Sequence, residues 1–241
     1  MDFLHQGFDA LEAAHDPQTL RCKVTALTQS LGFEHFAYAL QIDLQLNRPI
    51  QHTFSSYPQP WIQRYVAENY FAVDPVFTRA METPMPVIWH EKHFLDTHAV
   101  QLWEEARRFG IAHGLSVAVR DRPGFKGVFS LARDGALDVT GKDLSALIGD
   151  VQILACLVHA AVMRIEVPSL IPQVTVDLTD RERECLRWAG DGKTAWEIGQ
   201  ILGISERTAV FHLNNCVGKL GATNKTQAIV NAISLGLLRL A

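Results

Sequence analysis

The feature that most constrains this chain is a pair of matching helix starts in its C-terminal quarter. Thr179 is followed three residues later by Glu182, and Thr194 is followed in the same way by Glu197. In each pair the hydroxyl can accept a hydrogen bond from the third backbone amide of a helix, while the carboxylate accepts one from the capping residue. The spacing therefore predicts two helices in close succession.

A tight turn and two more helices complete this segment. Gly203 can take the left-handed conformation that ends a helix, and Ser205 is a suitable cap for the next one. Helices are predicted at about 180–190, 195–202 and 206–219, with a fourth after Asn224. This order is typical of a helix-turn-helix domain, although a small helical bundle with a solvated polar face fits the same pattern.

The third predicted helix has a packed face and an outward face. The apolar positions on one face are Ala209, Leu213, Cys216 and Leu220, which should pack on Leu186, Ile198 and Leu202. Arg207, Val210 and Asn214 share the other face. In a DNA major groove, Arg can bond guanine or a phosphate, Asn can bond adenine, and Val can contact a thymine methyl group.

Three lysines near these helices are candidates for phosphate contacts: Lys193, Lys219 and Lys225. Charge alone does not decide the matter. Residues 177–241 hold eight Lys and Arg against seven Asp and Glu, whereas residues 1–170 hold fourteen against nineteen. A nearly neutral module can still bind DNA if its cations share one face.

The remainder of the chain mixes helical and strand periodicity. Strands are expected at 36–42, 114–120 and 127–133, and helices at 17–30, 61–70, 76–81, 99–110 and 141–165. This order predicts an α+β protein, with an N-terminal α/β/α sandwich around an antiparallel sheet and a C-terminal all-α four-helix domain. Pro168 and Pro172 mark the joint. The expected divisions are a domain at 1–165, a linker at 166–176 and a DNA-binding domain at 177–241.

Composition favours a cytoplasmic protein. The N-terminal residues lack the basic start of a signal peptide, and no segment is expected to supply the roughly 18 uncharged apolar residues of a membrane span. The four cysteines, Cys22, Cys156, Cys185 and Cys216, show no metal-binding spacing and are expected to be free thiols.

One cluster holds residue types that can ligate a metal in an enzyme site: His90, His93, Asp96 and His98. Their spacing does not match the HxHxDH pattern of metal-dependent lactonases or HExxH, so solvated loop histidines are the preferred interpretation. The sequence also lacks a Gly-x-Ser-x-Gly nucleophile turn. No catalytic residue and no metal site is predicted.

Residues 178–238 resemble the DNA-binding domain of LuxR-type quorum-sensing regulators, through ISERT, FH, KLGATNK and the final A-x-x-x-G-L-L. The match departs at Ala209-Val210, where relatives commonly carry Val and a polar residue, so an apolar side chain stands on the predicted DNA-facing side. The first half resembles the autoinducer-binding domain of the same family, through YPQPWIQRYVAENYFAVDPV, VIWH and ARRFGIAHGLSV. Six hallmark positions match: Trp61, Tyr65, Asp74, Pro75, Trp89 and Gly114.

The resemblance implies a ligand site for an N-acyl homoserine lactone. Asp74 would accept from the ligand amide and Trp61 would donate to the lactone carbonyl. Tyr57 and Ser130 would serve the acyl carbonyl. The walls or supports would be Tyr65, Trp89, Phe77 and Leu115. From the residues alone, Asp74 before Pro75 is first a helix cap, and the aromatic residues are first core.

The expected function is therefore a quorum-sensing transcription factor that binds this lactone and acts as a homodimer on a dyad-symmetric DNA site. The implied partners are promoter DNA, the lactone, a second copy and RNA polymerase, with no cofactor besides the ligand and no membrane. A constitutive or non-lactone-responsive regulator of the same fold remains the alternative, and a lactone-degrading enzyme is a second. A response regulator is disfavoured because the first half does not show a parallel sheet.

Overall fold

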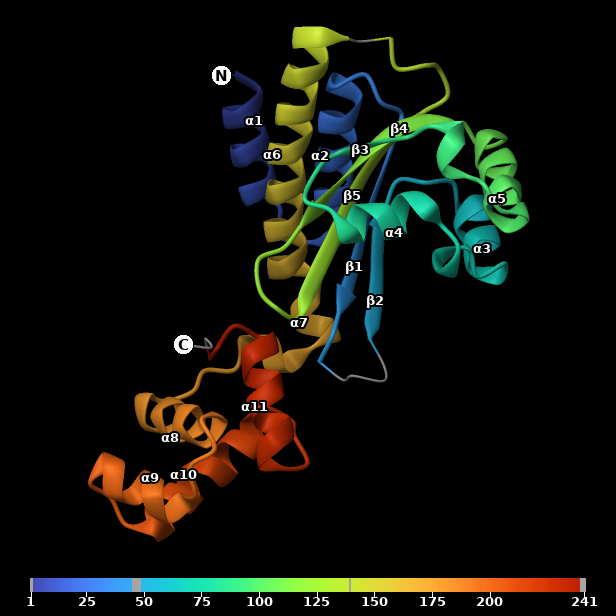
Figure 1. Cartoon of the computed structure of the whole chain (residues 1–241). Helices are drawn as coiled ribbons and strands as arrows, with labels where there is room; N and C mark the ends of the chain where they lie inside the picture. Colours follow the sequence, from blue (N-terminus) through green and yellow to red (C-terminus); the bar gives the residue numbers. More distant parts are fainter. Residues whose placement is uncertain (1, 45–48, 139, 239–241) are drawn as a thin grey trace. The chain divides into compact units, whose positions relative to one another are not determined.

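The computed structural model describes residues 2–44, 49–138 and 140–238 and divides into two compact units (Figure 1). The first unit holds residues 1–40, 51–120 and 126–166. The second holds residues 41–50, 121–125 and 167–241. One junction thus falls between Glu166 and Val167, inside the segment predicted as a linker.

A five-stranded sheet forms the centre of the first unit, in the order β2-β1-β5-β4-β3. The strands are β1 (His35–Ile42), β2 (Ile50–Ser55), β3 (Val87–Ile88), β4 (His113–Val119) and β5 (Phe125–Arg133). β4 is antiparallel to β5, with Ser116 opposite Ser130, and β3 is antiparallel to β4. The antiparallel sheet predicted from the sequence is confirmed.

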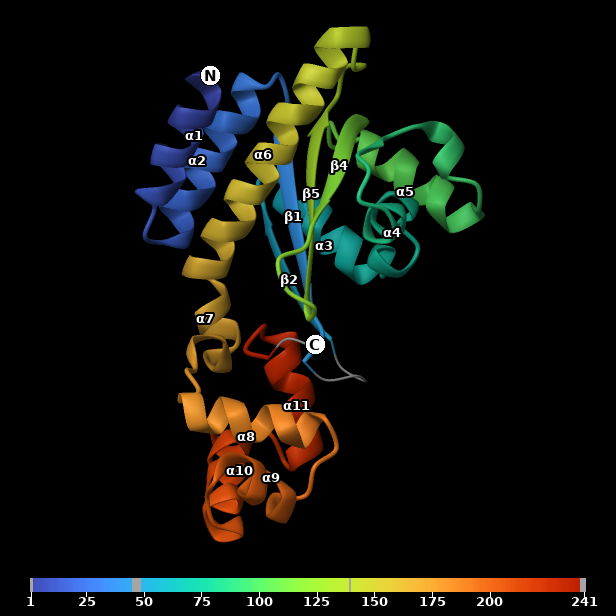
Figure 2. The same cartoon turned by 60° about the vertical axis from the view of Figure 1, so that its left-hand side comes forward.

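Helices cover both faces of this sheet (Figures 1 and 2). One layer holds α1 (Asp2–Glu12), α2 (Pro17–Ser30) and α6 (Gly141–Ile165), and the other holds α3 (Gln59–Ala67), α4 (Pro75–Glu82) and α5 (Thr97–Arg107). The α/β/α sandwich is therefore also confirmed. Buried side chains fill both interfaces, because alternate residues of each strand face opposite layers.

Several predicted boundaries shift for local reasons. The helix expected over 61–70 ends at Ala67, because Asn69 adopts a left-handed conformation with φ of 52°, and a short 3-10 helix, η1 (Tyr70–Ala72), follows it. The sequence prediction missed α1, β2 and β3 entirely. β2 carries polar residues along its length and β3 has only two residues, so neither shows a clear alternation.

The expectation that no segment approaches a membrane span was wrong for α6. This 25-residue helix contains an 18-residue window of mean hydropathy 1.9, of which 39% is buried. Its buried residues, among them Val151, Leu154 and Val158, belong to the core of the first unit. Packing in a folded core accounts for that part of its apolar character, and length and composition alone are weak evidence for a membrane helix.

The segment with two prolines is also more helical than predicted. α7 (Val167–Leu170) and a 3-10 helix, η3 (Pro172–Thr175), lie within it, and Val167 and Ile171 are buried. Pro168 stands in the first turn of α7, where a helix needs no backbone N–H donor, so this proline is tolerated.

Between residues 180 and 238 the second unit contains four helices, as predicted: α8 (Asp180–Gly190), α9 (Ala195–Leu202), α10 (Glu206–Lys219) and α11 (Lys225–Ser234). Both capping boxes are present, with the hydroxyl and the carboxylate bonds formed in each. Gly203 takes the left-handed conformation, with φ of 67°, and the Ser205 side chain caps α10. The helix-turn-helix prediction is confirmed.

The packed face of α10 also agrees with the prediction. Ala209, Leu213, Cys216 and Leu220 are buried, as are Leu186 and Ile198, whereas Leu202 is only half-buried. Gly199 is a contributor that the sequence prediction did not identify. A Cβ atom there would lie 2.8 Å from the carbonyl oxygen of Ile204, so glycine allows the turn to approach α9 closely.

Candidate functional site

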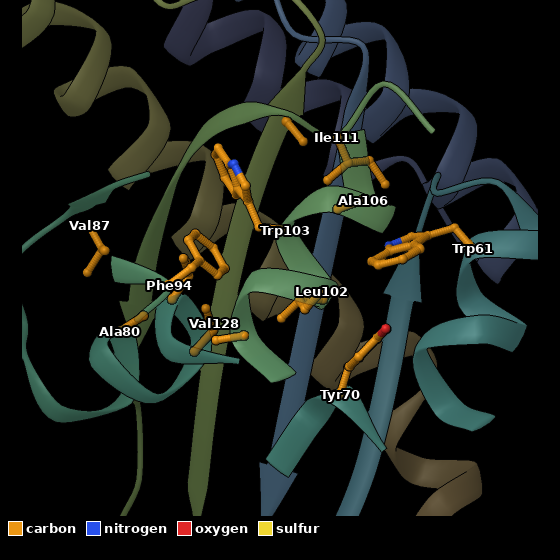
Figure 3. Packing of buried hydrophobic residues seen from close by; sticks show 13 residues of the cluster. Trp61, Tyr70, Ala80, Val87, Phe94, Leu102, Trp103, Ala106, Ile111 and Val128 are labelled. Atoms are coloured by element: carbon orange, nitrogen blue, oxygen red, sulfur yellow. The ribbon is translucent and has the colours of Figure 1, made fainter. Parts of the chain in front are cut away.

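A cavity of about 210 Å³ lies in the first unit. It is lined by residues of the strands β1, β2 and β5 and of the helices α3, α4 and α5. Most of the residues that line the cavity are aliphatic or aromatic. Figure 3 shows some of them around Leu102, within a cluster of buried hydrophobic residues. All six residues predicted to bind ligand line it: Tyr57, Trp61, Tyr65, Asp74, Trp89 and Ser130. Phe77, predicted as a wall, lines it too, but Leu115 does not, because it alternates with Ser116 along β4 and is buried on the other face of the sheet. An apolar cavity with a few polar groups is the usual form of a small-molecule site.

Asp74 caps α4 and borders the cavity with the same carboxylate. Its Oδ1 atom accepts hydrogen bonds from the backbone amides of Val76 (2.9 Å) and Phe77 (3.1 Å). Its Oδ2 atom accepts one from the hydroxyl of Tyr65 (2.9 Å). The capping role is therefore real, and Oδ2 is the oxygen with acceptor capacity left for another donor.

Burial dominates the electrostatics around this carboxylate. It raises the pKa of Asp74 above its ordinary value, and the bonds from Phe77, Tyr65 and Val76 oppose that shift. Burial, together with the charge of Asp74, also raises the pKa of both Tyr57 and Tyr65. Both phenols therefore stay protonated at neutral pH and act as hydrogen-bond donors.

Donors on three aromatic side chains that line the cavity have no hydrogen-bond partner among the residues that the structure describes. These are the indole N–H groups of Trp61 and Trp103 and the hydroxyl of Tyr57. The ring of Trp61 is held by contacts with Tyr65 (centroids 5.8 Å apart) and Phe109 (5.6 Å). Because a buried donor without an acceptor is costly, these groups favour a ligand with carbonyl oxygens.

Trp89 is fixed by a hydrogen-bonded chain. Its indole N–H donates to the hydroxyl of Ser116 (2.9 Å), which in turn bonds the hydroxyl of Ser130 (2.7 Å). The sequence prediction missed Ser116, since only the pairing of β4 with β5 places it opposite Ser130. Gly114 supports the same arrangement, because a Cβ atom there would lie 2.1 Å from the Leu131 carbonyl oxygen and 3.1 Å from the Trp89 ring.

The β1 strand creates space for the cavity. Ala37 and Ala39 line it, whereas Phe36, Tyr38 and Leu40, at the alternate positions, are fully buried. The Tyr38 hydroxyl lies 2.5 Å from Nδ1 of His159 on α6, which places these larger side chains in the opposite layer. This alternation of large and small residues is visible in FAYAL and could have been interpreted as a pocket floor.

An ion pair joins two of the helices that cover the cavity. Arg64 on α3 bonds both carboxylate oxygens of Glu105 on α5, with Nε–Oε2 and Nη2–Oε1 distances of 2.8 Å. These bonds lower the pKa of Glu105 to about 2. A bidentate pair of this kind fixes geometry, so it holds the helix of Trp61 against the helix of Leu102.

The residues predicted to face DNA lie on one exposed side of α10. Arg207, Val210 and Asn214 are all exposed, and Val210 is 40% exposed. Lys225 is exposed and Lys193 half-buried. Lys219 has a different partner: its Nζ atom lies 2.7 Å from Oε2 of the buried Glu182 and 3.3 Å from the carbonyl oxygen of Asp177.

The histidine-rich segment shows a local ring contact. The rings of His90 and His93 lie 5.7 Å apart in an edge-on arrangement. Within residues 2–44, 49–138 and 140–238, no group of three or more His, Cys, Asp or Glu side chains is arranged to hold a metal ion.

Two family models match the chain over separate stretches. The autoinducer-binding domain matches residues 16–162, and the bacterial regulatory proteins of the luxR family match residues 176–232. The chain belongs to the LuxR family of quorum-sensing transcriptional regulators. It is 37% identical to the transcriptional activator SolR of Ralstonia nicotianae over 96% of this chain and 97% of that protein. Like its relatives, this LuxR-family chain is a regulator rather than an enzyme.

Solved structures agree with this assignment. The crystal structure of Escherichia coli SdiA matches with a TM-score of 0.83 and 26% identity, covering 99% of both chains. A further structure holds SdiA in complex with octanoyl-rac-glycerol. CepR2 of Burkholderia cenocepacia, described as dependent on N-acylhomoserine lactone, matches 68% of this chain and 97% of its own, with 31% identity and a TM-score of 0.59.

Proposed function

We propose that this LuxR-family regulator binds an N-acyl homoserine lactone in the cavity and then controls transcription as a homodimer on a dyad-symmetric DNA site. The observation that carries the ligand assignment is the set of polar groups in an otherwise apolar cavity. Trp61 and Tyr57 offer hydrogen-bond donors, and Oδ2 of Asp74 offers an acceptor. An acyl homoserine lactone supplies the complement, which is two carbonyl oxygens, one amide N–H and an apolar chain.

In this proposal the indole of Trp61 donates to the lactone carbonyl and Tyr57 donates to the acyl carbonyl, with Ser130 beside it. Asp74 accepts from the ligand amide. Val76 stands where some relatives have Thr, so this ligand would be held without that hydroxyl. Each neutral hydrogen bond is worth about 0.5–1.5 kcal/mol net, and burial of the chain adds about 0.8 kcal/mol per methylene.

A second ligand class deserves the same test because SdiA has been solved with octanoyl-rac-glycerol. An acylglycerol has an ester carbonyl and an apolar chain, and its free hydroxyl groups, in place of an amide N–H, can donate to Asp74. The competing proposal is thus a regulator of the same fold that answers a non-lactone acyl compound. Direct titration of the protein with an acyl homoserine lactone and with octanoylglycerol distinguishes the two classes.

The homodimer proposal is supported by α6 and by the DNA-binding fold. Ile153, Cys156 and Ala160 follow one another at helical spacing and are half-buried or exposed on this strongly apolar helix. Helix-turn-helix dimers read two half-sites related by a dyad. We expect Ala160→Glu to weaken dimerisation, because it places a charge on this stripe without removing a buried group, and sedimentation velocity measures the change.

Outside the ligand site, we propose that Arg207, Val210 and Asn214 contact base edges and that Lys193 and Lys225 contact phosphates. For Lys219 a phosphate contact would compete with its ion pair to Glu182. RNA polymerase is the further partner we propose, and the cytoplasm is the location where the chain would meet its promoter DNA.

The test is operator binding by the full chain, measured by fluorescence anisotropy with a selected DNA site. We expect an acyl homoserine lactone to strengthen binding and a DNA half-site to bind far more weakly than the full dyad. The lactone proposal is overturned if no lactone alters DNA binding, whether octanoylglycerol alters it or no ligand does.

A further inference from the structure

The cavity has a polar end and an apolar end along the strands of the sheet. The backbone amide of Glu34 donates to the carbonyl of Ala132 (3.1 Å), and that of Asp43 donates to the carbonyl of Gly124 (2.8 Å). β1 and β5 therefore run in opposite directions. Ala37 lies near the level of Ser130, and Ala39 lies near the level of Val128, two residues or about 7 Å further along the sheet.

The apolar end has room because its strand residues are small. Ala39 and Val128 line the cavity there, and Thr53 of β2 lines it as well. Trp61 and Val128 lie on opposite sides of Leu102 in Figure 3, which separates the indole donor from this end. The next residues on the same face of the two strands, Gln41 and Lys126, are polar and end the apolar surface.

Two aromatic rings wall the side of the cavity formed by α5. The rings of Phe94 and Trp103 lie 4.6 Å apart, and both residues are less than a tenth exposed. Rings in close contact leave no volume between them for a flexible chain. A ligand anchored at Trp61 and Asp74 therefore finds its space along β1 and β5.

Resting on the proposed lactone function, we infer that the acyl chain lies over Ala37 and Ala39 and that Ala39 and Val128 set the longest chain accepted. The polar residues beyond them stop the chain after the length of two strand residues past Ser130. The protein therefore binds hexanoyl or octanoyl homoserine lactone more tightly than the dodecanoyl compound. Side-chain size at these two positions shifts this preference in opposite directions.

The test measures dissociation constants for the butanoyl, hexanoyl, octanoyl and dodecanoyl lactones on the purified full chain. Three tryptophans line the cavity, so quenching of their fluorescence reports binding. Ala39→Leu fills the apolar end and is expected to weaken octanoyl binding at least tenfold relative to butanoyl binding. Val128→Ala makes room for about two methylenes and is expected to improve dodecanoyl binding roughly 15-fold relative to octanoyl.

Val117→Ala is the matched control, because Val117 is fully buried on β4 but does not line the cavity. It should lower stability without changing the order of the four lactones. Where a variant does not purify without ligand, the lactone concentration that gives half-maximal soluble yield provides the same ranking. If the wild-type protein binds lactones and both Ala39→Leu and Val128→Ala keep its order of lactone affinities, this inference alone is refuted. A wild-type protein that binds no lactone would overturn the proposed function and this inference together.

Discussion

Asp74→Asn separates the two roles that the structure gives to this side chain. Oδ1 holds the backbone amides of Val76 and Phe77, and Oδ2 is the oxygen that borders the cavity beside Tyr65. Asparagine caps helices as well as aspartate does, so its carbonyl oxygen can replace Oδ1. Its amide nitrogen then stands where Oδ2 was, and a donor faces the ligand's own N–H donor.

The expected loss of affinity is that of a hydrogen bond to a charged acceptor, about 1.5–3 kcal/mol. This corresponds to a rise of roughly 10- to 150-fold in the dissociation constant. The free energy of unfolding of the ligand-free protein should not fall in Asp74→Asn and is expected to rise. Burial raises the pKa of Asp74 in the folded protein, so the buried charge costs stability at neutral pH, and this cost is relieved as the pH falls through the raised pKa. Asparagine removes the cost.

The assay is a lactone titration together with a melting curve without ligand, for wild type and Asp74→Asn. We expect weaker binding with an unchanged or higher melting temperature. Wild-type affinity should also fall as the pH drops through the raised pKa of Asp74, whereas the affinity of the variant should not follow that profile. A variant that melts several degrees lower and binds lactone like wild type would show that Asp74 is only a cap.

Three more substitutions test other parts of the account. Asn214→Ala removes an exposed side chain of α10, so operator affinity should fall by about 1–3 kcal/mol in an anisotropy titration with the melting temperature unchanged; unaltered operator affinity would refute the base contact. Lys219→Met leaves the buried Glu182 carboxylate without its cation, and we expect urea unfolding of the second unit to report a loss of about 1–3 kcal/mol, with no loss contradicting a structural ion pair. Gly114→Ala places a Cβ atom 2.1 Å from a backbone carbonyl oxygen, so soluble yield should collapse even with lactone present, and a normal yield would show that β4 tolerates the shift.

Local chemistry explains which parts of the fold could be predicted from the sequence. The capping boxes at Thr179 and Thr194 and the turn at Gly203 depend on residues within four positions of one another, so their pattern is complete in the sequence. The same holds for Asp74 as the cap of α4. Resemblance then placed the six pocket residues, all of which line one cavity, although their contacts with a ligand stay predictions.

The parts that were missed depend on residues far apart in the chain. Ser116 meets Trp89 only because β3 and β5 flank β4, and Lys219 pairs with Glu182 across 37 residues. The role of Ala39 follows from which face of β1 meets the helical layer. None of these partners is fixed by local spacing, because each requires the sheet or the bundle to be assembled first.

The central claim is that the cavity is a lactone sensor, and the most direct measurement is the melting temperature of the full chain with each member of an acyl homoserine lactone panel. A ligand at 100 times its dissociation constant stabilises the folded state by about 2.7 kcal/mol. For a chain of this size that corresponds to a rise of roughly 5–10 °C. The account predicts such a rise for at least one lactone and a much smaller one for Asp74→Asn. The account is contradicted if no lactone raises the melting temperature, whether octanoylglycerol raises it or no compound does.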